Sequence, residues 1–362
     1  MIQENRNNNF NLLRFIAATQ VFFAHTCHHL QIGTNSILQL LWKFLLIIPG
    51  VPIFFILSGL LISASYERSP NLTSYFIKRC LRIYPALWFA LGLSILMLTL
   101  TGYWPNHPVS QFAFYKWVIA QLSIVQFYNP SFLQGFGIGV LNGSLWTISV
   151  ELQFYLLIPL IYLFHKRFNK SNLSLILLIL IFILLNIFCN YFIKQDNLYG
   201  KILHVSFIPH IYFFLLGIFL HKNKSFFMTL CANRFLFYFL AYAIVCFVFK
   251  NSMQIGSNSP NPLIVMLLAL VIFSFGHSLT KLNVIFKTND ISYGIYIYHM
   301  LVINLFVQYG WTNNAILIIP VFILTFILAT LSWFFIEKPS LNFYITKPRQ
   351  LQDHHLWTKP IN

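Results

Sequence analysis

The stretch NLSLILLILIFILLNIFCNYF, residues 172–192, decides the fold class. It contains no charged side chain, and a helix of about 20 mostly apolar residues is what the hydrocarbon core of a bilayer requires. Similar runs recur along the chain, which is 58% hydrophobic and only 8% charged. A soluble domain usually has about 25% charged residues. The sequence therefore predicts an all-α, polytopic membrane protein.

Hydropathy predicts about ten transmembrane helices. They are expected at 10–29, 45–66, 83–102, 144–164, 172–192, 203–221, 231–249, 262–278, 291–309 and 314–336. An eleventh candidate, 112–128, is interrupted by Lys116 and Gln121. If 112–128 does not cross, the Lys and Arg clusters between the helices all lie on one side. Because cytoplasmic loops are rich in Lys and Arg, the charges favour ten spans, two cytoplasmic termini and an interfacial 112–128.

The formal net charge is +16. In a soluble protein this would indicate nucleic-acid binding, but here the cations lie between apolar runs, as they do in loops that face anionic lipid. Membrane lipid is therefore the expected partner, and nucleic acid is not. Cys27, Cys80, Cys189, Cys231 and Cys246 fit neither a disulfide framework nor a zinc site, so no metal is expected.

Ionisable side chains are costly inside a span, and three of those in the predicted spans are singled out here. Arg14 and His25 are eleven residues apart on one helix face, roughly 16 Å along the axis. With the N-terminus inside, Arg14 lies near the cytoplasmic leaflet and His25 near the outer one. Glu151 lies roughly 10 Å from the outer end of its helix, at a depth comparable to that of His25. An interfacial anchor would explain Arg14 equally well, and contacts between helices would explain His25 and Glu151.

Two further segments stand out, one for its small residues and the other for its basic residues. Ser58 and Gly59 in GVPIFFILSGLLIS would let another helix or a ligand chain approach closely. The loop segment YFIKRCLRIYP places Lys78, Arg79 and Arg82 just before the next helix. Anionic lipid explains such a cluster, and so does a phosphate-bearing cytoplasmic ligand, because Arg forms paired hydrogen bonds to phosphate.

Taken in order, these segments resemble the membrane acyltransferase-3 family, bacterial proteins that O-acylate cell-envelope glycans. The matching elements are Arg14 with His25, Phe54 to Gly59, Arg79 to Pro85, Trp146 to Pro159, Ser292 to His299, and Ile336 to Pro339. The family domain is therefore expected over 1–340, with 341–362 as a short cytoplasmic tail. Many members have a second Glu after the one that matches Glu151, whereas this chain has Leu152. No role of that second carboxylate is carried over.

The resemblance implies an acyltransferase of the bacterial cytoplasmic (inner) membrane. Its donor would be cytoplasmic acyl-CoA, bound as a substrate rather than as a permanent cofactor, and acetyl is the acyl group that the family favours. Its acceptor would be a hydroxyl of an extracytoplasmic glycan, with lipopolysaccharide O-antigen or another surface polysaccharide as the first candidate. The residues expected to bind the CoA phosphates are Arg14, Lys78, Arg79 and Arg82. The oligomeric state is left open.

The predicted catalytic residues are His25 and Glu151. His25 would act as general base on the sugar hydroxyl, or would relay the acyl group itself, since an imidazole titrates near working pH. Glu151 would orient His25 if their helices pack together. Candidates for the acceptor pocket or for support are Trp146, Ser149, Tyr296, His299 and Ser58. For His299 a role as a second acid or base is the alternative, and a structural role is favoured.

A transporter of an acyl donor or lipid-linked sugar is the alternative. Transporters also place Arg, His and Glu inside spans. They are often built from inverted repeats with broken helices, and no such repeat is seen in this sequence.

Overall fold

The computed structural model describes residues 8–32, 45, 47–69, 71–107, 109–168, 171–195, 197–249, 258–278, 282 and 289–346. Within these ranges the chain forms helices and turns and no strand. This confirms the predicted all-α class.

The helices follow one another closely along the chain. The first half contains α1 (Phe10–His29), α3 (Gly50–Glu67), α4 (Leu72–Leu100), α5 (Tyr103–Asn106), α6 (Gln111–Leu122), the short turns η1 (Ser131–Leu133) and η2 (Gly143–Leu145), and α7 (Trp146–Arg167). The second half contains α8 (Asn172–Ile193), α9 (Leu198–His204), α10 (Ile211–Lys222), α11 (Lys224–Cys231), α12 (Phe235–Val248), α13 (Pro262–Gly276), α14 (Ser292–Gln308), η4 (Ala315–Leu317), α15 (Ile318–Ser332), the π-turn η5 (Trp333–Glu337) and α16 (Lys338–Thr346).

Within the described ranges, five helical segments are long and apolar enough to cross a membrane. They are Gly50–Glu67, Leu72–Leu100, Gly143–Arg167, Asn172–Ile193 and Ala315–Phe343. The α11–α12 pair, bent by 84°, provides a sixth if it is counted as one broken span. The chain is therefore a multi-pass membrane protein.

The centre of the bundle is a close crossing of α3 and α10, with α1, α8 and α13 packed against it and α14 packed on α1. A Cβ atom at Gly59 would overlap the backbone carbonyl of Phe214, and one at Gly217 would overlap that of Ile56. Glycine at these two positions therefore lets the helix backbones touch. Of the two uses expected for Gly59, close approach of another helix or of a ligand chain, the structure shows the first.

The basic cluster lies on a helix, and its prediction as a loop was wrong. The Asn71 side chain accepts a hydrogen bond from the Ser74 backbone N–H (2.8 Å), which begins α4 at Leu72 and leaves Pro85 inside the helix. Hydropathy detects only the part of a helix that lies in lipid. At 29 residues, α4 is roughly 43 Å long and exceeds the hydrocarbon thickness, so its first turns project beyond the core.

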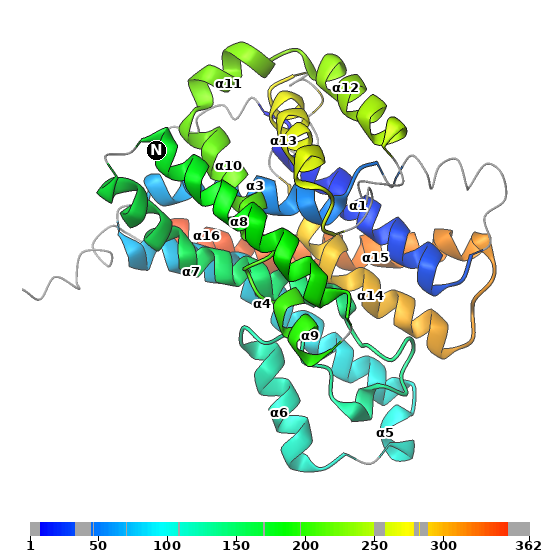
Figure 1. Ribbon diagram of the computed structural model, residues 1–362. Coiled ribbons are helices and arrows are strands. Elements are labelled where there is room, and N and C mark those ends of the chain that lie inside the picture. Colours follow the sequence, from blue (N-terminus) through cyan, green and yellow to red (C-terminus); the bar gives the residue numbers. More distant parts are fainter. Residues whose placement is uncertain are drawn as a thin grey trace, which may run out of the picture.

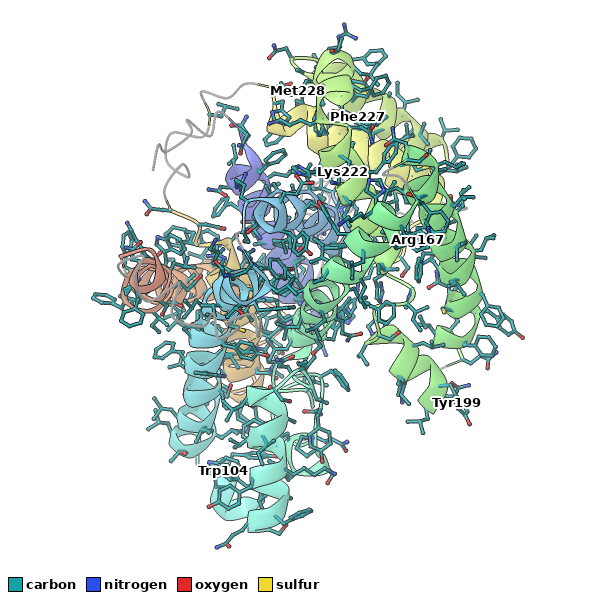
Figure 2. All side chains as sticks on the ribbon, turned by 90° about the vertical axis from the view of Figure 1, so that its left-hand side faces the viewer. Trp104, Arg167, Tyr199, Lys222, Phe227 and Met228 are labelled. Carbon is teal, nitrogen blue, oxygen red and sulfur yellow. The ribbon has the colours of Figure 1, made fainter. Side chains whose placement is uncertain are left out.

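The doubtful segment 112–128 forms α6, which has 12 residues. That is roughly 18 Å, too short to cross a bilayer. The Gln121 side chain then donates to the carbonyl groups of Gln126 and Tyr128, which turns the chain back. Together α5 and α6 form a lobe that projects at the bottom of Figure 1, opposite α11 and α12. Figure 2 shows the same arrangement, with Trp104 on the lobe and Phe227 and Met228 on α11.

The predicted tail 341–362 is described only at its start. Helix α16 runs through this start to Thr346, and residues 347–362 lie outside the described residues.

Candidate active site

A pair of histidines joins α1 to α14. The Nδ1 atom of His25 lies 2.9 Å from Nε2 of His299, whose side chain is fully buried. The Nδ1 atom of His299 lies 3.1 Å from the Ile295 carbonyl. A carbonyl only accepts hydrogen bonds, so Nδ1 of neutral His299 carries the proton and its Nε2 accepts. His25 then donates from Nδ1, and its Nε2 keeps a free lone pair with no hydrogen-bond partner among the described residues.

Glu151 was expected to orient His25 on the condition that their helices pack together, and the structure pairs the two side chains with other residues. The Oε1 atom of Glu151 accepts hydrogen bonds from Ser58 (2.8 Å) and from Tyr155 (2.6 Å). Helix α3 packs against both α1 and α7 and supplies Ser58. Counting residues gave the depth of each side chain along its helix axis, but it could not show which neighbour each helix face meets.

A cavity lies where α1, α3, α4, α7 and α14 meet, and we call it the arginine cavity. Its polar lining includes Arg14, Arg82, Glu151, Tyr155 and Tyr296, and its free volume is about 40 Å³. Such a volume admits a few water molecules, so a substrate chain would have to part these side chains. Glu151 therefore shares a cavity with two of the predicted donor-binding arginines.

Asp290, which the sequence analysis did not select, links those arginines. Its Oδ2 atom lies 2.9 Å from Nη1 of Arg14 and 2.6 Å from Nη2 of Arg82. Burial alone would raise the pKa of Asp290, but the adjacent guanidinium groups and the hydrogen bonds from Ser292 hold it below its usual value. The available signal was a lone acid immediately before a span, in DISYG.

Glu337 completes this ion-pair network, with Oε2 lying 3.4 Å from Nη1 of Arg82. Its side chain is only 1% exposed. Two arginines thus face two carboxylates, and the paired charges make burial in the bundle tolerable.

The other two predicted donor-binding residues, Arg79 and Lys78, lie in different surroundings. Arg79 donates to the Ser65 hydroxyl (3.3 Å) and lies over the Tyr155 ring, 5.9 Å from its centre. It therefore lies close to the arginine cavity. Lys78 is half-buried, and none of the described residues forms a hydrogen bond or ion pair with it. The structure thus brings together three of the four basic residues and leaves Lys78 apart.

The acceptor candidates divide into two groups. The Tyr296 hydroxyl lies 2.7 Å from that of Thr147, and its ring centre is 5.9 Å from that of His299. Tyr296 therefore lies between the arginine cavity and the histidine pair. Ser149 instead donates to Gln126 (2.7 Å), and Trp146 packs on His204 with ring centres 4.2 Å apart. Ser58 supports Glu151, as described above.

Comparisons with known proteins agree with the family resemblance found in the sequence. The acyltransferase-3 family, described as an acyltransferase domain, matches residues 7–336. The chain is 34% identical to nodulation protein 10 of Rhizobium leguminosarum bv. viciae, over 92% of this chain and 93% of that protein. It is 27% identical to a putative acetyltransferase, ORF330, of Acidianus two-tailed virus, over 83% of this chain and 84% of that protein. No solved structure matches. By this family match and these relatives, the chain belongs to the acyltransferase-3 family and is a membrane acyltransferase.

Proposed function

We propose that this protein transfers an acetyl group from cytoplasmic acetyl-CoA to a hydroxyl of an extracytoplasmic glycan. Lipopolysaccharide O-antigen is the first candidate acceptor, and the bacterial cytoplasmic membrane is the proposed location. The observation that carries the proposal is the Nε2 atom of His25, which has no hydrogen-bond partner among the described residues and is held as a base by the His299 contact at Nδ1.

The proposed reaction uses that lone pair directly. Nε2 of His25 takes the proton of the sugar hydroxyl while the oxygen attacks the thioester carbonyl. The C–O bond forms, the C–S bond breaks, and the proton passes to the departing CoA sulfur. His299 accepts the Nδ1 proton of His25 in a hydrogen bond and so steadies the cationic imidazole. In the acyl-histidine variant, the same Nε2 attacks the thioester first, and the C–S bond breaks to leave an acyl-imidazolium and the CoA thiolate. The sugar oxygen then takes the acyl group from Nε2, and its proton passes to the thiolate.

The arginines supply the proposed donor end. Arg14 lies roughly 16 Å from His25 along α1, and both Arg14 and Arg79 keep a buried Nε–H with no partner among the described residues. These donors suit phosphate oxygens. Because Asp290 and Glu337 already balance Arg14 and Arg82, Arg79 has the least compensated charge of these three arginines and is the best candidate for the CoA phosphates.

Replacing Arg79 by Gln is expected to raise the KM for acetyl-CoA by about tenfold, since a charge-assisted hydrogen bond is lost. Lys78→Gln is the matched control, because it removes a neighbouring positive charge that has no partner among the described residues. Steady-state kinetics with varied acetyl-CoA measures both. Equal KM increases in the two variants would mean that the cluster acts only through its net charge.

We also propose ten spans with both termini in the cytoplasm. The shortness of α6 and the one-sided distribution of the Lys and Arg clusters support this topology. The arginine cavity then lies toward the cytoplasm. His25, the α5–α6 lobe and the loop before α13 lie toward the outside.

This topology predicts which engineered cysteines react with a membrane-impermeant thiol reagent added to intact cells. In a protein with its five native cysteines replaced, a cysteine at Pro260 should be labelled and one at Phe168 should not. Permeabilised cells, in which both should react, provide the control. Labelling at both positions in intact cells would overturn the proposed orientation.

Transfer of labelled acetyl from acetyl-CoA to an O-antigen polysaccharide by the purified protein in vesicles tests the function. Acetyl ester on the glycan is the expected product. Movement of label across the vesicle membrane without ester formation would instead support a transporter.

A further inference from the structure

A second cavity, of about 170 Å³, lies apart from the arginine cavity. It is enclosed by the C-terminal half of α4, by α6, by the segments 126–129 and 140–146, and by the end of α9. Its lining contains no Asp, Glu, Lys or Arg, so we call it the neutral cavity. A phosphate or a carboxylate would find no counter-charge there, and this excludes the CoA phosphates as its ligand.

The polar groups of the neutral cavity are amides in fixed positions. The Gln121 amide nitrogen donates to the carbonyl groups of Gln126 and Tyr128, and that of Asn129 donates to Gly139 (2.8 Å). The Oε1 atom of Gln121 and the Oδ1 atom of Asn129 accept no hydrogen bond from the described residues. Gln121 is only 8% exposed. Two immobilised acceptors are therefore available for the hydroxyl groups of a ligand.

Trp146 and His204 add an aromatic surface with unused polar atoms. Both line the neutral cavity, and their ring centres are 4.2 Å apart. Neither the indole N–H nor the imidazole nitrogens of this pair have a hydrogen-bond partner among the described residues. Apolar faces that carry a few placed donors and acceptors suit a ligand with both C–H faces and hydroxyl groups. An uncharged sugar ring has this chemistry.

The neutral cavity also lies against α14, the helix that carries His299. Its lining residue Asn142 donates to the Ile297 carbonyl of α14 (2.8 Å). A few residues on, Thr147 contacts Tyr296 of the same helix, which carries His299. One short segment therefore faces the neutral cavity on one side and the helix of the histidine pair on the other. In the proposed topology this region faces the outside, where the acceptor glycan arrives.

We propose that the neutral cavity binds an uncharged sugar residue of the acceptor glycan, next to the residue that is acylated. This rests on the proposed function for the identity of the ligand. Binding itself requires no acetyl-CoA, so it is tested separately from transfer. The amide acceptors select hydroxyl groups, and the absence of charge selects against uronic acids.

The experiment uses the full-length protein in lipid nanodiscs and saturation-transfer NMR with methyl glycosides of glucose, galactose, rhamnose and N-acetylglucosamine. Methyl glucuronide is the charged probe. At least one neutral glycoside should bind saturably and glucuronide should not. Trp146→Leu and His204→Leu should each weaken binding by about tenfold. Trp311→Leu, which removes a half-exposed aromatic ring beyond α14, should leave it unchanged.

Folding is monitored by thermal unfolding of each variant, and Asn129→Ala, which removes one amide acceptor, provides a milder second test. The proposal is overturned if no neutral glycoside binds the wild type saturably. It is also overturned if glucuronide binds equally well, or if the folded Trp146 and His204 variants bind like the wild type. Sugar binding without acetyl transfer would refute the proposed function and leave the sugar site standing.

Discussion

Replacement of His25 by Ala is expected to lower kcat for acetyl transfer by about 10²-fold or more, with the KM for acetyl-CoA nearly unchanged. The variant lacks the only nitrogen proposed to take the hydroxyl proton, and general-base catalysis contributes about 10²–10⁴-fold. His28→Ala is the matched control, because His28 lies one turn further along α1 and is exposed. Initial rates with both substrates varied separate kcat from KM.

The partner of His25 provides the second part of this test. His299→Leu removes the acceptor for the His25 Nδ1–H, so the ring loses its preferred tautomer, and kcat should fall by about tenfold or more. His299→Gln can still accept that hydrogen bond and should retain more activity than His299→Leu. The pH profile should change in the Leu variant, because His25 then titrates without its neighbour. Wild-type transfer by His25→Ala, or equal rates for the two His299 variants, would contradict the assignment.

Replacement of Asp290 by Asn is expected to destabilise the protein by about 3–5 kcal/mol, the cost of removing one partner from a buried ion pair. The amide keeps the shape of the side chain but leaves Arg14 and Arg82 facing one carboxylate in place of two. The measurement is thermal or denaturant unfolding of the purified protein. A large loss of stability is also expected to lower the yield of folded protein.

Glu67→Gln is the matched control for Asp290→Asn. Glu67 also pairs with a cation, Lys222, at 2.6 Å, but its side chain is 37% exposed. An exposed pair contributes about 0–1 kcal/mol, so this variant should remain near wild-type stability. Combining Asp290→Asn with Arg14→Gln should cost less than the sum of the two single changes, because each removes the same contact. Equal, small effects at Asp290 and Glu67 would mean that the arginine network does not stabilise the bundle.

The fold class could be predicted because apolar runs of membrane-spanning length are visible in the local composition of the chain. The run at 172–192 became α8 almost residue for residue. Helix ends were predicted less well. Asn71 begins α4 before the apolar segment starts, and a cap of this kind depends on one local hydrogen bond rather than on hydropathy.

The sequence predicted which residues would lie near one another better than it predicted which of them would be in contact. Arg14, Arg82 and Glu151 share the arginine cavity, but His25 pairs with His299 rather than with Glu151. Asp290 escaped notice because one acid at a helix end is more often a cap or a solvated residue than a bridge. Its importance appears only when two arginines from distant parts of the chain contact the same oxygen.

From the sequence alone, the bilayer environment and the depth of each polar residue along its helix could be determined, because a helix rises a constant 1.5 Å per residue. The tertiary structure alone decided which helix faces meet. Gly59 and Gly217 bring α3 and α10 into backbone contact, while α3 also packs between α1 and α7. Helix packing is set by the fit of many side chains at once. That fit directed His25 to His299 and both arginines to Asp290.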